Sequence, residues 1–415
     1  MRILEGLKKD RYVRTVEQRG ANDLAEVEPA VRRIVDHVRY NGDRALRRYA
    51  ARWDGLGRSE PLRVPEADLD EAWRRTPSEL QDAIKQAAAN IRRYCEWQKP
   101  EEWRREIQPG VCVGQLVRPL ESVGCYVPGG RYPLPSTLLM TVIPALVAGV
   151  PQIRVMSPRP AQATLAAAAS LGVREFYRAG GAQAVAALAY GTESIPRVNK
   201  IVGPGNRYVT AAKKLVAFDC VIEFLAGPTE AVFISAEGNP VFIASDLAAQ
   251  AEHDPDALCI FITSSRGLAK AVQTEVQRRA RANPIAAESL SRHGAILLVD
   301  SLDEAVEAAN RIAPEHLTLP AALALAVQNA GSIFLDEFTP QSAGDYISGP
   351  NHVLPTGAMA RVHGGLSVLD FVRIISCQEI SGEGIRRLAP PAIVLAEAEG
   401  LHGHAESMRV RRSYA

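Results

Sequence analysis

Hydrophobic and polar residues divide the chain into stretches with different periodicities. Up to about residue 98, apolar residues recur at positions i, i+3 and i+4 between charged residues, which predicts amphipathic helices. From residue 122 to 217, short β-branched runs alternate with apolar helical segments, and the alternation resumes at residue 230. Such alternation predicts parallel sheets covered by helices. We therefore expect an α/β protein with two Rossmann-like parallel-sheet domains and helical N-terminal and C-terminal extensions, the last from about Ser367.

The helices of the two alternating stretches are expected between strand-like runs such as SVGCYVP, QIRVMSP, AVFISAE and GAILLVD. Their predicted ranges are 136–148, 161–171, 182–190 and 207–217 in the first stretch, and 240–252, 267–283, 302–312 and 321–329 in the second.

Charge and composition exclude several classes of partner. The 415 residues include 48 Lys and Arg against 47 Asp and Glu, a formal net charge of +1, without a long basic run. This balance argues against a nucleic-acid binder and against a polybasic membrane anchor. The longest apolar run, 138–150, is shorter than the roughly 20 residues of a spanning helix. The first residues are charged where a signal peptide is apolar, so we expect a cytoplasmic protein.

Six cysteines, at 95, 112, 125, 220, 259 and 377, form no C-x-x-C pair. We expect reduced and mostly buried thiols. A metal site would then need His, Asp, Glu or amide ligands.

Three glycine loops follow predicted strands: 128–130, 180–183 and 203–206. The last is a G-x-G with Tyr208 where a dinucleotide fingerprint has Gly or Ala, and Glu223 stands where a ribose-binding acid would. Taken alone, this motif favours a tight turn between strand and helix over a dinucleotide site. Together, the three loops would lie at the carboxyl ends of one parallel sheet, which suggests a nucleotide-sized ligand.

Four further clusters carry candidate chemistry. Gln250 and His253 share a helix face and could reach one metal, although a helix end favours a histidine in any case. Glu315 and His316, after Pro314, could act as two proton acceptors or simply open a helix.

The other two clusters are polar connections. The loop 344–355 is rich in glycine and proline and carries Asp345 and His352, and long polar loops of this kind are often functional. In 399–404 an acid and two histidines alternate with glycines, which predicts a connection rather than a continuous helix.

The ordered motifs GPGN, AGPTE, SDLAAQAEH, APEHL, GDYISGPNHVLPT and EGLHGH resemble those of the histidinol dehydrogenase family. The resemblance runs from about Gly124 to the end of the chain and is weaker in the first hundred residues. It implies a zinc-dependent and NAD-linked enzyme that oxidises L-histidinol through L-histidinaldehyde to L-histidine. These are the last steps of histidine biosynthesis, and they consume two NAD molecules.

The resemblance also implies a role for each matched position. The residues implied as ligands of one zinc ion per subunit are Gln250, His253, Asp345 and His404. The implied proton acceptors are Glu315 and His316. Those implied to bind NAD are Tyr126, Gln183 and Asn206. Those implied to bind substrate are Thr229, His352 and Glu399, together with His316 and the zinc ligands. The family is a homodimer whose C-terminal segment completes the partner's active site, so Glu399 and His404 would act across the interface.

On this basis we expect four segments. They are an N-terminal helical extension (1–21), a discontinuous first α/β domain with the zinc and catalytic residues (22–125 with 230–366), an NAD-binding second α/β domain (126–229) and a C-terminal helical dimerisation segment (367–415).

Two positions leave alternatives open. The family motif A-G-P-S-E has Ser where this chain has Thr229, which keeps the hydroxyl and reduces the pocket volume. The alternative function is therefore a related zinc and NAD dehydrogenase of another small primary alcohol, such as a sulfonated diol. His402, beside His404, is a second candidate ligand. An alternative of a different class is a two-domain ligand-binding protein without catalysis.

Overall fold

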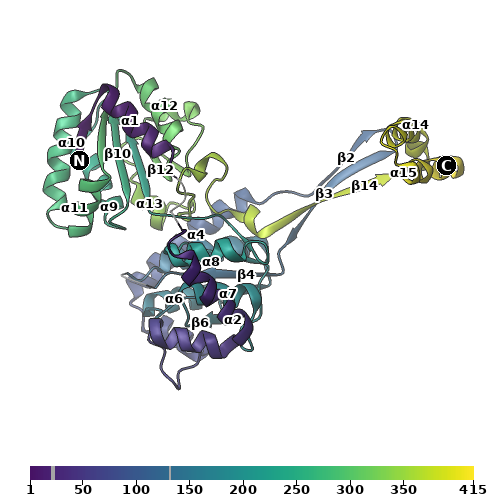
Figure 1. The fold of residues 1–415 in the computed structure, drawn as a ribbon, viewed down its shortest axis with the longest axis horizontal. Coiled ribbons are helices and arrows are strands. Elements are labelled where there is room, and N and C mark those ends of the chain that lie inside the picture. The colour runs from purple at the N-terminus through teal and green to yellow at the C-terminus, as the bar shows by residue number, and fades with distance from the viewer. Residues whose placement is uncertain (20–23, 130–131) are drawn as a thin grey trace.

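The computed structural model describes residues 1–19, 24–129 and 132–415. Two lobes, each built on a parallel sheet, lie beside each other, and a long arm extends away from both (Figure 1). Gly130 of the predicted loop 128–130 and the expected boundary at residues 21 and 22 lie outside the described residues. Among the described residues, no helix is long and apolar enough to cross a membrane.

The first lobe is built on a six-stranded parallel sheet of order β1-β11-β10-β9-β12-β13. Its strands are β1 (Arg2–Leu4), β9 (Glu230–Ile234), β10 (Leu258–Thr263), β11 (Ala295–Leu298), β12 (His316–Leu319) and β13 (Ser332–Leu335). Its helices are α1 (Gly6–Glu17), α9 (Pro240–Ala251), α10 (Arg266–Ala280), α11 (Pro284–Arg292), α12 (Leu302–Ile312) and α13 (Gln341–Tyr346), with a 3₁₀ turn over Ala321–Ala326. The central strands β9 and β10 are almost entirely buried, as expected for strands covered on both faces.

The second lobe is built on a five-stranded parallel sheet of order β6-β5-β4-β7-β8. Its strands are β4 (Ser122–Tyr126), β5 (Gln152–Met156), β6 (Glu175–Tyr177), β7 (Lys200–Val202) and β8 (Val221–Ile222). Its helices are α2 (Glu28–Tyr49), α3 (Glu66–Arg75), α4 (Ser78–Gln98), α5 (Pro135–Ala148), α6 (Gln162–Ser170), α7 (Gly181–Tyr190) and α8 (Arg207–Val216), with a π-helical turn over Ala50–Asp54. The α/β prediction is confirmed in both lobes, and α5 to α8 follow the predicted ranges within one residue at every boundary.

The N-terminal helices have different neighbours from those expected. Helices α2, α3 and α4 pack on α7, α6 and α5 of the second lobe, and two hydrophobic cores combine their buried faces with that sheet. The expected first domain would have grouped residues 22–125 with 230–366 instead. Strand β1 lies in a stretch predicted as helical and adds an edge strand to the first sheet.

The arm corrects the prediction of a wholly helical C-terminal segment. Strand β14 (Val372–Ile380) pairs antiparallel with β3 (Val111–Pro119), which pairs with β2 (Trp103–Gln108). A 3₁₀ turn over Val368–Phe371 precedes β14. Beyond β14 the segment is α-helical, in α14 (Gly382–Ala398) and α15 (His402–Tyr414), which pack on each other at the far end of the arm (Figure 1).

Candidate active site

The predicted proton acceptors lie where β12 begins. Helix α12 ends at Ile312, Ala313 takes a left-handed conformation with φ of 50°, and after Pro314 the chain enters the sheet at His316. The Pro-Glu-His sequence therefore opens a strand, and the alternative that it opens a helix is wrong. Glu315 is 7% and His316 3% exposed, so both side chains are buried.

The carboxylate of Glu315 is held by a backbone amide. Its Oε2 accepts a hydrogen bond of 2.9 Å from the N–H of Glu230, the first residue of β9, and lies 3.5 Å from Nδ1 of His316. Burial raises the pKa of Glu315, because the charged form loses its hydration, and the nearby His316 opposes this effect. The carboxyl group of Glu315 is thus kept out of water.

The imidazole of His316 lies between two carboxylates. Its Nε2 is 3.6 Å from Oδ1 of Asp345, and the ring stacks on Phe334 at a centroid distance of 5.8 Å. Burial alone would lower the pKa of His316, but the negative charges of Glu315 and Asp345 outweigh it and raise the pKa to about 10. Nδ1 of His316 is buried without a hydrogen-bond partner.

Two of the four implied zinc ligands, Gln250 and Asp345, are in contact beside this pair, and a third, His253, lies near enough for its charge to act on Asp345. Nε2 of Gln250, at the end of α9, donates to Oδ2 of Asp345 at 3.2 Å, and the amide is 1% exposed. His253 follows two residues after the end of α9, and its charge acts on Asp345 and on His352. Among the described residues, no group of three His, Cys, Asp or Glu side chains is arranged to hold a metal. One amide, one imidazole and one carboxylate nevertheless form a mixed N and O donor set that suits zinc and lacks a fourth ligand.

The fourth implied ligand lies far from these three in the same chain. His404 is in the first turn of α15 and Glu399 is the C-cap of α14, both exposed, at the far end of the arm (Figure 1). The connection predicted over residues 399–404 is shorter in the structure, because His402 and His404 already belong to α15. His402 is exposed in the same turn. Neither the arm nor its helices can complete the site within one chain.

His352 joins this site to the second lobe. Its Nδ1 lies 2.7 Å from the backbone oxygen of Asp345, and its Nε2 lies 3.1 Å from Oγ1 of Thr137 in the first turn of α5. Burial lowers the pKa of His352, so its neutral form is favoured. Thr229 immediately precedes β9 and is half-buried next to the amide that holds Glu315.

The three implied NAD residues all lie at the carboxyl edge of the second sheet. Tyr126 ends β4, and its hydroxyl accepts a hydrogen bond of 3.1 Å from the N–H of Gly181 at the start of α7. Gln183 is in the first turn of α7, and Asn206 caps α8 by accepting from the N–H groups of Tyr208 and Val209. This juxtaposition of loops was predicted from the sequence.

The carboxylate of Glu223 is buried and hydrogen-bonded within the protein, so it is not placed to bind a ribose. Its Oε1 accepts hydrogen bonds from the N–H of Gly203 at 2.8 Å and from Nζ of Lys213 at 2.5 Å, and the residue is buried. A Cβ at Gly203, where φ is 116°, would lie 2.0 Å from the carbonyl oxygen of Tyr126. Glu223 and Gly203 therefore fix the loop itself, and the resemblance of Glu223 to a ribose-binding acid is a coincidence of spacing.

Comparisons with known proteins agree with the motifs. A family model described as histidinol dehydrogenase matches residues 17–412. Histidinol dehydrogenase of Methanothermobacter thermautotrophicus is 47% identical, over 97% of this chain and 97% of the relative, and that of Geobacter sulfurreducens is 45% identical over 95% of each. The chain belongs to the histidinol dehydrogenase family.

The likeness to histidinol dehydrogenases extends to the whole fold. The crystal structure of histidinol dehydrogenase from Elizabethkingia anophelis matches with a TM-score of 0.94 and 34% identity, covering 100% of this chain and 98% of that one. The arm, which the sequence pattern did not predict, is therefore part of the shared fold.

The sequence analysis missed residues that hold the site residues in place. Oδ2 of Asp54 accepts hydrogen bonds from the N–H of Gly180 at 3.0 Å and from Nε2 of Gln183 at 3.2 Å. No motif marks Asp54, so no signal in a single sequence indicates this role. Glu230 is different, because it ends the AGPTE motif and could have been singled out there.

The cysteine prediction is confirmed, since all six are free thiols and four of them are buried.

A cavity of about 350 Å³ opens away from these site residues, at the carboxyl edge of the first sheet. It is lined by Phe233, Phe242, Asp246, Thr318, Asp336 and Glu337, among others. None of the predicted site residues lines it.

Proposed function

We propose that this protein is an L-histidinol dehydrogenase that oxidises its substrate twice, to L-histidinaldehyde and then to L-histidine. The observation that carries the proposal is the buried pair of Glu315 and His316, whose side chains have different partners beside Gln250 and Asp345. Family membership supports the substrate.

Two adjacent proton acceptors match a reaction with two different deprotonations. In the first oxidation His316 takes the hydroxyl proton of the alcohol as a hydride leaves the carbinol carbon. In the second, water adds to the aldehyde, Glu315 takes the proton of that water, and a second hydride leaves. Burial of both side chains limits escape and side reactions of the aldehyde.

The proposed zinc ligands are Gln250, His253 and Asp345 of one chain with His404 of a second. Zinc, when bound, would orient the amine and imidazole of the substrate as a template. The negative charge of Asp345 stabilises the protonated form of His316. This stabilisation is weaker when the carboxylate of Asp345 is bound to a cation. This brings the imidazole toward the neutral form that accepts a proton.

The proposed NAD contacts are Tyr126, Gln183 and Asn206, whose positions at the carboxyl edge of a parallel sheet support them. NAD supplies the acceptor for each hydride. The partial positive charge at the N-termini of α7 and α8 favours the negative charge of a pyrophosphate.

A homodimer is the proposed assembly. The arm extends away from its own lobes and carries Glu399 and His404 at its end, which supports their action in the active site of a second subunit (Figure 1). The proposed substrate contacts are Thr229, His352 and Glu399, with His316 and the zinc ligands. We propose a cytoplasmic location, which the free thiols support.

The test is NADH production by the purified, zinc-loaded protein. We expect two NADH for each L-histidinol and none from a sulfonated diol. Turnover of the diol without turnover of L-histidinol would favour the alternative suggested by Thr229. Binding of NAD and L-histidinol without any turnover would favour the non-catalytic binding protein.

A further inference from the structure

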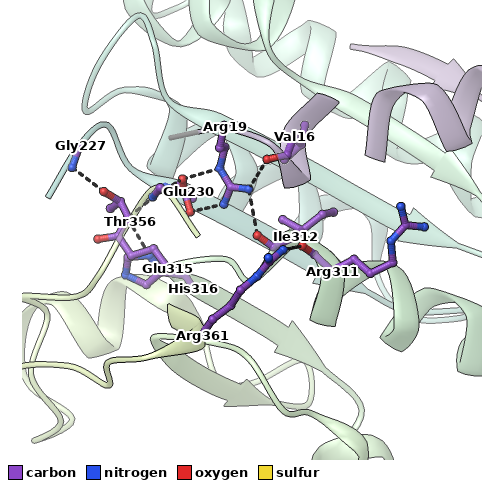
Figure 2. A network of polar contacts seen from close by, with 11 residues as sticks. Val16, Arg19, Gly227, Glu230, Arg311, Ile312, Glu315, His316, Thr356 and Arg361 are labelled. Atoms are coloured by element: carbon purple, nitrogen blue, oxygen red, sulfur yellow. Dashed lines mark hydrogen bonds and ion pairs between the residues drawn. The ribbon is translucent and has the colours of Figure 1, made fainter. Parts of the chain in front are cut away.

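An ion pair between a partly exposed arginine and a buried glutamate connects the N-terminal helix to the backbone around Glu315. Arg19, two residues beyond the end of α1, donates from Nε and Nη2 to the two carboxylate oxygens of Glu230 at 2.7 and 2.5 Å. Nη1 of Arg19 donates to the backbone oxygens of Val16 and Ile312 at 2.6 and 2.9 Å. Figure 2 shows the guanidinium pointing between Glu230 and Ile312, with every nitrogen engaged.

The carboxylate of Glu230 also accepts hydrogen bonds on both of its oxygens. The side chain of Glu230 is 6% exposed, and its Oε1 also accepts a hydrogen bond of 2.8 Å from the N–H of Gly357. A mostly buried ion pair of this kind adds little net stability, because desolvation offsets the attraction between the charges. Its geometry is nevertheless fixed, since a bidentate guanidinium allows one orientation of the carboxylate.

Two of the three partners of Arg19, Glu230 and Ile312, are connected to Glu315. The backbone N–H of Glu230 is the group that donates to Oε2 of Glu315. The carbonyl of Ile312 ends the helix from which the chain turns, through the left-handed Ala313, to Glu315. One guanidinium thus fixes the donor to the carboxylate and the start of the backbone segment that carries it.

We propose that Arg19 and Glu230 are positioning residues that set the orientation of the Glu315 carboxylate. This inference rests on the proposed function for its kinetic consequence, but its structural consequence is independent of any substrate. A displacement of about an ångström at a reacting group costs roughly a hundredfold in rate.

The chain offers a matched control. Glu17 accepts a hydrogen bond of 2.7 Å from Nη2 of Arg311 and so also joins α1 to α12. Within the described part of the chain, no hydrogen bond or ion pair links Glu17 or Arg311 to Glu230 or Glu315. Glu17→Gln therefore weakens the attachment of α1 without disturbing the Arg19 ion pair.

The experiment compares Arg19→Met, Arg19→Lys, Glu230→Gln and Glu17→Gln in the full-length, zinc-loaded protein. We expect kcat with L-histidinol to fall about 10- to 100-fold in Arg19→Met and Glu230→Gln, with KM changed by less than about threefold. Arg19→Lys keeps the charge but cannot bind both oxygens and the carbonyl together, so we expect a partial loss. Glu17→Gln should retain the wild-type kcat.

Hydrogen exchange of the Glu230 amide provides a second measurement without substrate. We expect exchange about tenfold faster in Arg19→Met than in wild type or Glu17→Gln, because the amide loses its fixed acceptor. Unchanged exchange and unchanged kcat in Arg19→Met would overturn the inference, as would equal losses in Glu17→Gln. If the wild type does not oxidise L-histidinol, the proposed function fails, and the exchange comparison still decides whether the pair positions Glu315.

Discussion

The two parallel sheets present opposite edges to the candidate site. In the second lobe, Tyr126, Gln183 and Asn206 lie at the carboxyl edge, where helices begin. In the first lobe, Glu230 and His316 are the first residues of their strands, so the site lies at the amino edge, beside the end of α9. His352 hydrogen-bonds to Thr137 between the two.

This difference has an electrostatic consequence. Helix N-termini carry partial positive charge and favour anions, whereas helix C-termini carry partial negative charge and favour cations. The second lobe therefore suits the phosphates of NAD, and the first suits a metal ion and a cationic substrate. In the proposed function, a similar architecture would serve two kinds of ligand because the two sheets use opposite ends.

The largest effect is expected at the amino edge of the first sheet. Replacing His316 with Asn or Glu315 with Gln should lower kcat by about 10² to 10⁴, the usual contribution of a positioned proton acceptor. NAD affinity, measured by fluorescence titration, should change less than about twofold, because NAD is assigned to the other lobe. A parallel loss of NAD affinity would contradict the proposal that the first lobe transfers protons and the second binds NAD.

Removal of a proposed metal ligand should affect the first lobe alone. In His253→Ala we expect bound zinc to fall below about a tenth of the wild-type content, measured by elemental analysis after dialysis. His293→Ala is the control, because the imidazole of His293 lies 3.4 Å from Asp256 and is not one of the proposed zinc ligands. Full zinc content in His253→Ala would remove this residue from the proposed ligands.

Strain at the carboxyl edge of the second sheet should be measurable as lost stability. Gly203→Ala forces a Cβ against the Tyr126 carbonyl at a φ of 116°, which should lower the free energy of unfolding by about 3 kcal/mol. In the control Gly149→Ala, φ is 88° and a Cβ would meet nothing within 4 Å, so we expect only about 1 kcal/mol. Urea unfolding distinguishes them, and equal losses would contradict close packing of the loop.

The cap of α8 provides a smaller test of the same edge. Asn206→Ala removes the acceptor for two N–H groups and should cost about 1 kcal/mol. Asn283 caps α11 in the same way in the first lobe, so Asn283→Ala should cost about as much in urea unfolding. Only Asn206→Ala should also raise the KM for NAD, and an equal rise in both variants would remove Asn206 from the NAD site.

The smallest effect is expected at the carboxyl edge of the first sheet, beside the cavity that none of the proposed site residues lines. Burial raises the pKa of Asp246, beside the cavity, to about 6. The native state then binds more protons than the unfolded state between about pH 4 and 6, so stability falls as pH rises through this window. With allowance for solvent screening, Asp246→Asn should be about 1 kcal/mol more stable than wild type above pH 6 and equal below pH 4. Thermal unfolding at both pH values checks this, and a difference independent of pH would contradict it.

The sequence alone determined those features whose signals are local. Apolar runs between strand-like segments predicted α5 to α8, and three glycine loops after strands predicted a shared edge. The adjacent pair Glu315 and His316 was likewise visible in a few consecutive residues. Such features depend on the spacing of neighbours along the chain, which a sequence states directly.

Tertiary structure decided the remainder. Strand β14 is exposed along almost its whole length, so it has no buried face and no alternating pattern, and its partner β3 lies more than 250 positions away at every pair. Glu223 matched a ribose-binding acid in spacing, yet pairs with Lys213 because the fold buries both. Arg19 and Asp54 act on groups in distant segments. Contacts between distant segments depend on how the chain folds back on itself, and no local pattern specifies them.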